Sequence, residues 1–402
     1  PTSLNVPHPF VLAAAPVQPG ARHNIFLEET ESRFLRIACT PDTDTAGYAV
    51  RQIELKQPEE AMTETSFYRL AAAKHPGCYP RWLSNEQAYW TLTGTPEDVL
   101  EVSLCEDGTL EPFKRGFTIM PLLRVKDELV TRENAALTQG LLDDCLPIPN
   151  VQWAYRDLVL DITALAHGGG LSSAYARYTL TNNGIGSQTG SLFLVIHPIQ
   201  VYPPWQEGHD GFARIKSIAS SNSHRVVTIN DNRKIFFLTR PDQFAAKGGT
   251  LQTGRPVEGD MADNVARGEI PPETAAQDPA GFASGAAVYH FTLAPGESRN
   301  LYLTIPLHSV QPHLNPEMRA EAIEEGFNRM LSESAAFWSE AVNRVTFDVP
   351  DRDLANTLKA NIAYNLITKD GPGFQPGSRS YDKAWMRDGS AAAIALLKMG
   401  YT

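Results

Sequence analysis

Hydrophobic and polar positions alternate with a period of two over most of the first three quarters of the chain, a pattern typical of β-strands. Residues 174–181 alternate in this way, and the turn-forming run 182–184 follows them. Residues 191–196 are hydrophobic on both faces, which indicates a strand between two layers. Similar short runs lie at residues 98–104, 118–124, 157–163 and 224–238. So many strands without intervening helices predict stacked antiparallel sheets, and we expect a large β-sandwich (a super-sandwich) over residues 1–310.

The end of this region carries two further signals. Residues 288–293 and 301–305 flank a Pro-Gly turn and predict two consecutive strands. Residues 241–286, in contrast, are rich in Gly, Ala, Pro and acidic residues and contain only two aromatic side chains. They predict a long loop or insertion between two strands.

The hydrophobic period changes to about 3.6 after residue 315, which predicts helices. Asn315 and Pro316 are typical of a helix start. The hydrophobic positions at helical spacing are Ile323, Phe327, Met330, Leu331, Phe337, Trp338, Val342 and Val345. Asp351 is predicted to cap a second helix that ends at the Gly-Pro-Gly run 371–373, and a third helix is predicted to begin near Asp388. We expect a linker helix in residues 311–346 and the start of a helical domain in residues 347–402.

Composition narrows the classes of partner. The chain has 402 residues, of which 42% are hydrophobic and 20% charged, as in an ordinary folded protein of about two or three units. Its formal net charge is -11, with acidic and basic residues mixed, which argues against a nucleic-acid partner. No apolar run reaches the roughly 18 residues of a membrane helix, so no membrane partner is expected. Neutral ligands remain compatible with this composition.

No metal or cofactor motif is present in the sequence. The cysteines at positions 39, 78, 105 and 145 form no CxxC pair, and we expect free thiols, with one or two disulfides as the alternative. Neither a zinc-protease His pattern nor a phosphate loop nor a serine-nucleophile elbow occurs. We therefore expect no metal and no cofactor. The side chains expected to be structural are Trp82, Trp90, Trp153, Trp205, His167, His197 and His224.

Candidate chemistry concentrates in residues 377–389, where five charged and two aromatic side chains precede the third predicted helix. Arg387 and Asp388 would each cost several kcal/mol to bury unpaired, so they are poor core residues. They suit a sugar pocket, because aromatic rings pack on pyranose faces while Arg and Asp hydrogen-bond hydroxyl groups. The alternative is structural: an Arg387–Asp388 pair that fixes the loop, with Asp388 capping the helix.

The run Trp385-Met386-Arg387-Asp388 resembles the Trp-x-Arg-Asp motif of glucoamylase-type six-hairpin glycosidases. The longer run 376–389 resembles large bacterial six-hairpin glycosidase-like proteins, some of them labelled coagulation-factor 5/8-type because of an attached discoidin-like module. The likeness extends over the whole chain, including residues 89–91 and 146–151, but only the C-terminal run is specific.

This resemblance implies that the helices begin an (α/α)6 barrel. It implies that Arg387 and Asp388 bind hydroxyls of a terminal sugar, that Trp385 shapes the pocket, and that Tyr381 is a further candidate for its wall. In such enzymes the catalytic acid and base come from later hairpins, so no catalytic residue is expected in this chain.

The resemblance also indicates the expected function. We expect the N-terminal part of a glycoside hydrolase-like protein acting on an oligosaccharide or polysaccharide, inactive alone and completed by the remaining, C-terminal part of the barrel. The alternatives are a non-catalytic carbohydrate-binding or assembly module, and a scaffold on which another chain completes the barrel. A scaffold of that kind would leave an apolar face exposed on the last helix.

Overall fold

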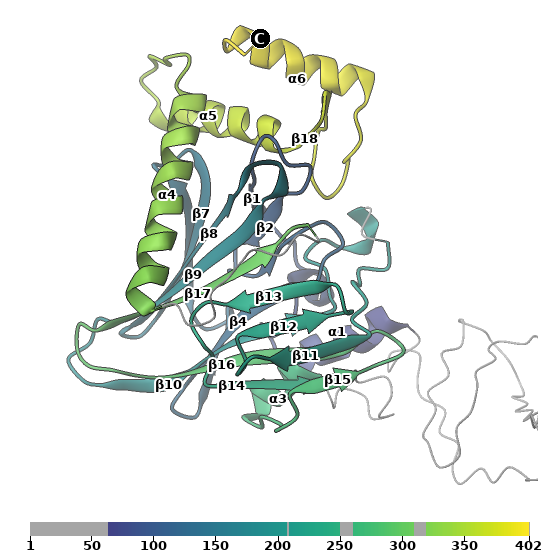
Figure 1. The fold of residues 1–402 in the computed structure, drawn as a ribbon, viewed down its shortest axis with the longest axis vertical. Helices are drawn as coiled ribbons and strands as arrows, with labels where there is room; N and C mark the ends of the chain where they lie inside the picture. Colours follow the sequence, from purple (N-terminus) through teal and green to yellow (C-terminus); the bar gives the residue numbers. More distant parts are fainter. Residues whose placement is uncertain (1–62, 207–208, 250–259, 309–318, 402) are drawn as a thin grey trace, which may run out of the picture.

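The computed structural model describes residues 63–206, 209–249, 260–308 and 319–401. Within these ranges, two large antiparallel sheets precede three long helices (Figure 1). The predicted fold class, a β-sandwich followed by helices, is confirmed.

One sheet contains eight of the described strands, all paired antiparallel. Their order across the sheet is β1 (Trp90–Thr93), β2 (Val102–Cys105), β3 (Leu110–Glu111), β4 (Thr118–Val125), β10 (Gln188–His197), β16 (Ser284–Leu293) and β14 (Gln243–Lys247), with β5 (Glu128–Val130) paired to β4.

The other sheet contains nine of the described strands, again antiparallel. Their order is β15 (Ala275–Gln277), β11 (Ser217–Ser221), β12 (Val226–Ile229), β13 (Arg233–Phe237), β17 (Ser298–Pro306), β9 (Ser173–Asn182), β8 (Leu158–His167), β7 (Leu146–Tyr155) and β6 (Ala136–Leu142).

Two of the turns that carry the chain from one sheet to the other lie side by side. The turn after β9 leads to β10, and the Pro-Gly turn after β16 leads to β17; in each case the two strands belong to different sheets. The Pro-Gly turn is therefore a corner of the sandwich, although its two strands lie where they were predicted. The corners are bound together: Asn182 N donates to Glu297 O at 3.0 Å, and Gly296 N donates to Asn182 O at 2.8 Å.

The main core lies between the sheets and is continuous from one to the other. Leu192, Leu194 and Ile196 of β10 point into it, whereas Phe193 and Val195 of the same strand join a second cluster on the opposite face. That second face is covered by α1 (Glu64–Lys74) and α3 (Met261–Arg267). The prediction that residues 191–196 lie between two layers is confirmed.

The prediction of a long loop is wrong for three parts of the stretch 241–286. It contains β14, α3 and β15, and its two aromatic side chains, Phe244 and Phe282, are fully buried. Asp260 begins α3, and its carboxylate accepts from the backbone N–H groups of residues 262 and 263. The small side chains that resembled loop composition allow β14 to pack closely beneath the helix.

The C-terminal helices lie on the outer face and one end of the sandwich (Figure 1). Their bounds are α4 (Ala320–Val342), α5 (Arg352–Ile367) and α6 (Met386–Lys398), with the short hairpin β18 (Lys369–Asp370) and β19 (Gly373–Phe374) after α5. α4 packs on β7 and β8 through buried Phe327 and Trp338, and α5 packs on α4, β7 and β1. Asp351 caps α5 as predicted, whereas the predicted cap Asn315 lies outside the described residues.

These helices do not form a closed ring within the described residues, so the (α/α)6 barrel stays a prediction. The domain bounds expected from the sequence stay predictions as well. None of the helices that the structure describes has the length and hydrophobicity needed to cross a bilayer.

The residues expected to be structural mostly are. Trp82 and Trp153 are buried and Trp90 is half-buried, but Trp205 is 62% exposed, with its ring edge-on to Trp82 at 6.1 Å. The thiols of Cys78, Cys105 and Cys145 are free and buried, whereas position 39 is outside the described residues. The free-thiol prediction is therefore confirmed for these three cysteines.

Candidate functional site

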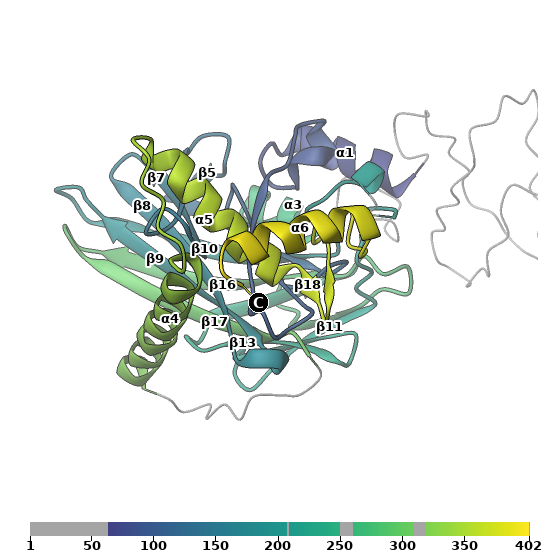
Figure 2. The same cartoon turned by 90° about the horizontal axis from the view of Figure 1, so that it is seen from above.

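The predicted sugar-binding residues lie on the loop between β19 and α6 and on the first turn of α6. Seen from above, α5 and α6 lie at the same end of the sandwich (Figure 2). α6 begins at Met386, with Trp385 as the N-cap residue in an extended conformation and without a side-chain capping bond. The extended backbone at Trp385 turns the chain from the loop into the helix, so the aromatic loop and the charged first turn adjoin each other.

Two aromatic side chains of the predicted site come together. The ring centroids of Tyr381 and Trp385 are 5.6 Å apart, with the planes at 62° in an edge-on arrangement. Tyr381 is 61% exposed and Trp385 is 38% exposed. Tyr381 has a positive φ of 57°, a left-handed conformation that a bulky residue rarely adopts without surrounding constraint. The two rings together form an exposed apolar surface on the loop before α6.

The charged residues of the motif follow in the first turn of α6. Arg387 Nη2 lies 3.4 Å from Asp388 Oδ1, and the side chains are 91% and 31% exposed, respectively. An exposed pair of this length contributes little to stability. Asp388 lies inside the helix and Trp385 holds the N-cap position, so the alternative in which Asp388 caps the helix is wrong. In the described residues these two side chains have no hydrogen-bond partner beyond each other.

The loop is instead fixed by Arg379, which is 1% exposed. Its Nε donates to Glu111 Oε1 at 2.6 Å, and its Nη1 donates to Glu101 Oε1 at 2.9 Å. Nη2 donates to the backbone oxygens of Glu101 and Glu111 at 3.2 and 3.3 Å, and Nη1 also reaches Ser378 O at 3.4 Å. Asp382 makes a second attachment, an ion pair with Lys114. The loop is therefore attached to the sandwich through both residues.

The two glutamates are both perturbed by burial. Desolvation raises the pKa of Glu101 to about 7, against the attraction of Arg379. Desolvation likewise raises the pKa of Glu111, which is opposed by Arg379 and by the hydrogen bond from Val201 N. The cluster therefore contains one guanidinium and two buried carboxyl groups, and burial disfavours the ionisation of both carboxyl groups at once.

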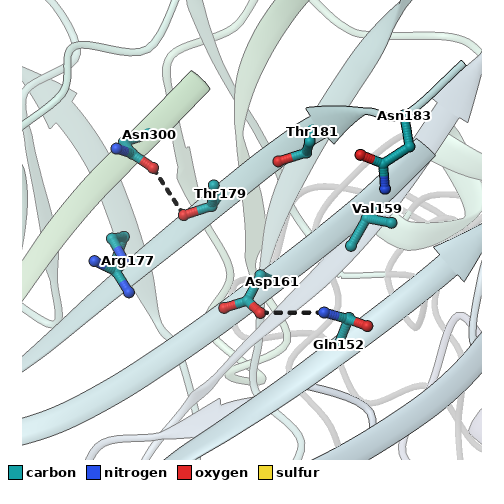
Figure 3. Close-up of a pocket in the computed structure, with 8 residues that line it drawn as sticks. All are labelled: Gln152, Val159, Asp161, Arg177, Thr179, Thr181, Asn183 and Asn300. Carbon is teal, nitrogen blue, oxygen red and sulfur yellow. Dashed lines mark hydrogen bonds between the residues drawn. The ribbon is translucent and has the colours of Figure 1, made fainter. Parts of the chain in front are cut away.

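A separate depression of about 470 Å³ lies on the outer face of the nine-stranded sheet (Figure 3). Its polar side chains come from four adjacent strands and include Gln152, Asp161, Arg177, Thr179 and Asn300. Thr179 Oγ1 donates to Asn300 Oδ1 at 2.8 Å, and Gln152 Nε2 to Asp161 Oδ2 at 3.5 Å.

The same depression is bounded on one side by α4, because the Arg177 guanidinium lies 5.2 Å from the centre of the Phe327 ring. The surface is rich in both donors and acceptors, and no aromatic residue lines it. It is therefore suited to polar, uncharged ligands.

Sequence reasoning found the exposed aromatic and charged residues but missed the role of Arg379 and its two glutamates. Arg379 is 268 and 278 residues from its partners, so no local spacing could reveal the contact. It also missed the polar depression, whose residues read as ordinary outward positions of strands. No group of three or more His, Cys, Asp or Glu in the described ranges is arranged to hold a metal ion.

The end of the sandwich that carries the predicted site also exposes hydrophobic side chains from the last two helices. These side chains are Leu354, Leu358, Met386, Ile394 and Leu397, between 36% and 88% exposed. An exposed apolar face of this kind is the feature expected of an incomplete helical layer.

Comparison with known proteins gives only distant likenesses. No family model matches the chain, and no curated protein sequence matches it. A bacterial glucoamylase solved in complex with acarbose aligns with 78% of the chain at 10% identity and a TM-score of 0.48. A putative kojibiose phosphorylase from the human microbiome aligns with 69% at 8% identity (TM-score 0.25), and a polysaccharide lyase with 59% at 14% identity (TM-score 0.30).

All three solved proteins are named as carbohydrate-active enzymes. The chain spans 50%, 31% and 34% of their respective lengths.

Proposed function

We propose that the chain is the N-terminal part of a glycoside hydrolase-like protein that acts on oligosaccharides or polysaccharides. Trp385, Arg387 and Asp388 bind the sugar, and Tyr381 extends the aromatic wall. The observation that carries the proposal is an exposed aromatic pair on a fixed loop next to an Arg–Asp pair in the helical turn that follows the loop.

The chemistry of these groups is complementary to a pyranose ring. The apolar C–H face of the sugar packs on an aromatic ring, and the ring hydroxyls need both donors and acceptors at its edge. Arg387 supplies donors, and the carboxylate of Asp388 accepts hydrogen bonds that are stronger than neutral ones. Asp388 lies in the first helical turn, where the helix dipole favours its negative charge.

The proposal assigns no catalytic acid or base to the described residues. Hydrolysis of a glycosidic bond requires two carboxyl groups on opposite sides of that bond. Asp382 is paired with Lys114, and Glu101 is buried against Arg379, so neither is free to serve. On this proposal the two groups come from further helices that cover the exposed apolar side chains of α5 and α6. The chain by itself then binds sugar without hydrolysing it.

The test is sugar binding observed at Trp385 itself. The six tryptophans are replaced by 5-fluorotryptophan, and the Trp385 fluorine resonance is assigned with the Trp385→Phe variant. Neutral trisaccharides with glucose, xylose or mannose units, and rhamnose- or glucuronate-containing oligosaccharides, are then added. We expect one class to shift the Trp385 resonance at micromolar to millimolar concentration. The resonance of exposed Trp205 should stay unchanged; if no sugar moves Trp385, the proposal is wrong.

The role of Asp388 is tested in the complete protein. Asp388→Ala should lower sugar turnover by orders of magnitude while leaving the circular-dichroism spectrum unchanged and the melting temperature nearly so, because the side chain has only a weak ionic contact and the helix dipole contributes at most about 1 kcal/mol. Asp353→Ala, which removes an exposed aspartate from the first turn of α5, is the matched control. Equal turnover in both variants would contradict the assignment.

A second candidate function, a non-catalytic carbohydrate-binding module, is favoured by the polar depression on the nine-stranded sheet. Asp161→Ala removes a carboxylate from its floor and should abolish binding if the sugar docks there. Trp385→Phe should then have no effect. The opposite pattern would locate binding at the loop and exclude this second function.

A further inference from the structure

Arg379 uses its entire hydrogen-bonding capacity on the sandwich and its own loop. A guanidinium has five N–H donors. Nε donates to the Glu111 carboxylate, and Nη1 donates to the Glu101 carboxylate and to Ser378 O. Nη2 donates to the backbone oxygens of Glu101 and Glu111, so all five N–H groups are hydrogen-bonded. Such saturation in a side chain that is 1% exposed fixes the position and orientation of the guanidinium.

The partners of Arg379 belong to the rigid part of the molecule. Glu101 immediately precedes β2 and Glu111 lies in β3, and these strands pair with Ser103 opposite Glu111. The second oxygen of Glu111 is held by Val201 N at 2.9 Å. Without the guanidinium, two carboxyl groups would be left buried side by side, which is costly unless they are neutralised. The two buried carboxyl groups therefore need a neighbouring cation, and Arg379 is that cation.

Arg379 lies close along the chain to the proposed sugar site. Arg379 precedes Tyr381 by two residues and Trp385 by six. Asp382, which pairs with Lys114, lies between the two aromatic residues. Tyr381 keeps its left-handed conformation between these two attachments. A short chain held at residues 379 and 382 has few conformations left, so the direction of the Tyr381 ring follows from the attachments.

We infer that Arg379, held by Glu101 and Glu111, is a positioning residue that orients the Tyr381–Trp385 surface for sugar binding, so that the β-sandwich determines the geometry of the site. The part of this inference that concerns sugar rests on the proposed function. The part that concerns the loop does not.

The test uses Arg379→Met, with Arg352→Met, an exposed arginine at the start of α5, as the matched control. Hydrogen exchange is measured for residues 375–385 and, as a reference for the fold, for β9. In Arg379→Met the loop amides should exchange at least about 100-fold faster, because one partner of a buried ionic cluster is lost. The Trp385 fluorine resonance should shift or broaden, and sugar affinity should fall about tenfold or more. Arg352→Met should behave as wild type.

A charge-balanced variant separates positioning from simple stability. Arg379→Met combined with Glu101→Gln and Glu111→Gln removes the buried charges together and should recover the melting temperature lost in Arg379→Met. It should not recover slow loop exchange or sugar affinity. Recovery of affinity along with stability would overturn the positioning role, as would unchanged loop exchange in Arg379→Met.

Failure of the proposed function gives a different result. If the wild-type chain binds no sugar, the function is wrong, while loop exchange and the Trp385 resonance still decide whether Arg379 holds the loop. If wild type binds and Arg379→Met frees the loop without loss of affinity, the function stands and the inference falls.

Discussion

Replacing Glu101 by glutamine should make the protein more stable at alkaline pH, relative to wild type, than at acid pH. The glutamate is almost fully buried, and desolvation raises its pKa from 4.5 to about 7. Glutamine has nearly the same shape, keeps an oxygen that can accept from Arg379 Nη1, and does not titrate. Glu111 remains as the ionic partner of Arg379 in this variant. The charged and titratable groups that face the cluster are Arg379, Glu111, Asp370, Asp382, Lys114, Tyr202 and Cys105.

The direction follows from proton binding. Between pH 4.5 and about 7 the folded protein keeps the Glu101 proton that the unfolded chain has lost, so folding becomes less favourable as the pH rises through this window. The difference between the two pKa values corresponds to about 3 kcal/mol. This contribution is fully present below the unfolded pKa and has been lost above pH 7. The free energy of unfolding of Glu101→Gln, minus that of wild type, should therefore rise by up to about 3 kcal/mol from pH 4.5 to pH 8.

The assay is urea unfolding at closely spaced pH values from about pH 3 to pH 8, followed by tryptophan fluorescence and circular dichroism. Glu128→Gln is the control of opposite sign, because hydrogen bonds from Tyr155 and Arg156 lower the pKa of exposed Glu128. Its stabilising effect is lost only as the pH falls below 4.5, so the free energy of unfolding of Glu128→Gln, minus that of wild type, should fall as the pH rises to 4.5 and stay constant from there to pH 8. For Glu101→Gln, a difference that is independent of pH between 4.5 and 8, or that falls as the pH rises, would refute the reasoning.

Three further predictions concern packing, the depression and the thiols. Phe327→Ala should lower the free energy of unfolding by about 3–5 kcal/mol in urea titrations, because it opens a cavity between α4 and the sheet, whereas Phe337→Ala, 45% exposed, should cost far less. Thr179→Val removes the hydroxyl that donates to Asn300 while keeping the side-chain volume nearly constant. If sugar binds at the loop before α6, this variant should bind sugar as wild type does, measured by the shift of the Trp385 fluorine resonance. Cys78 and Cys105 should react with a thiol reagent at pH 8 only as fast as the protein unfolds, since burial raises the pKa of both thiols; rapid labelling of folded protein would contradict this.

The strands and helices could be predicted because their signal is local. The alternation of residues 174–181 and the helical spacing of Phe327 and Trp338 record which face of each element meets a core. The assignment of strands to sheets could not be predicted from the same signal. Residues 288–293 and 301–305 are separated by a hairpin-like turn, yet each strand pairs with partners in a different sheet. Pairing depends on contacts far apart in sequence, which a period of two does not encode.

The failure over residues 241–286 has a related cause. Phe244, Ala245 and Ala246 in β14 are all buried, so this strand has no polar face to produce an alternation. Its small side chains are depleted in strands generally, and they suit this position because α3 packs on the same strand. Burial on both faces by neighbouring elements therefore overrode the local composition.

The charged segment before α6 shows why a site can be predicted from the sequence while its support cannot. The sequence groups five charged residues there and does not separate those that bind the sandwich from those that face solvent. The structure divides at least four of them: Arg379 and Asp382 bind the sandwich, whereas Arg387 and Asp388 stay exposed. Fixing each residue of an exposed loop costs about 1–2 kcal/mol in conformational entropy, which two exposed aromatic rings cannot offset. A loop that presents its aromatic and charged groups to solvent in one arrangement needs attachments elsewhere, and the buried arginine is the kind of attachment that this requirement predicts.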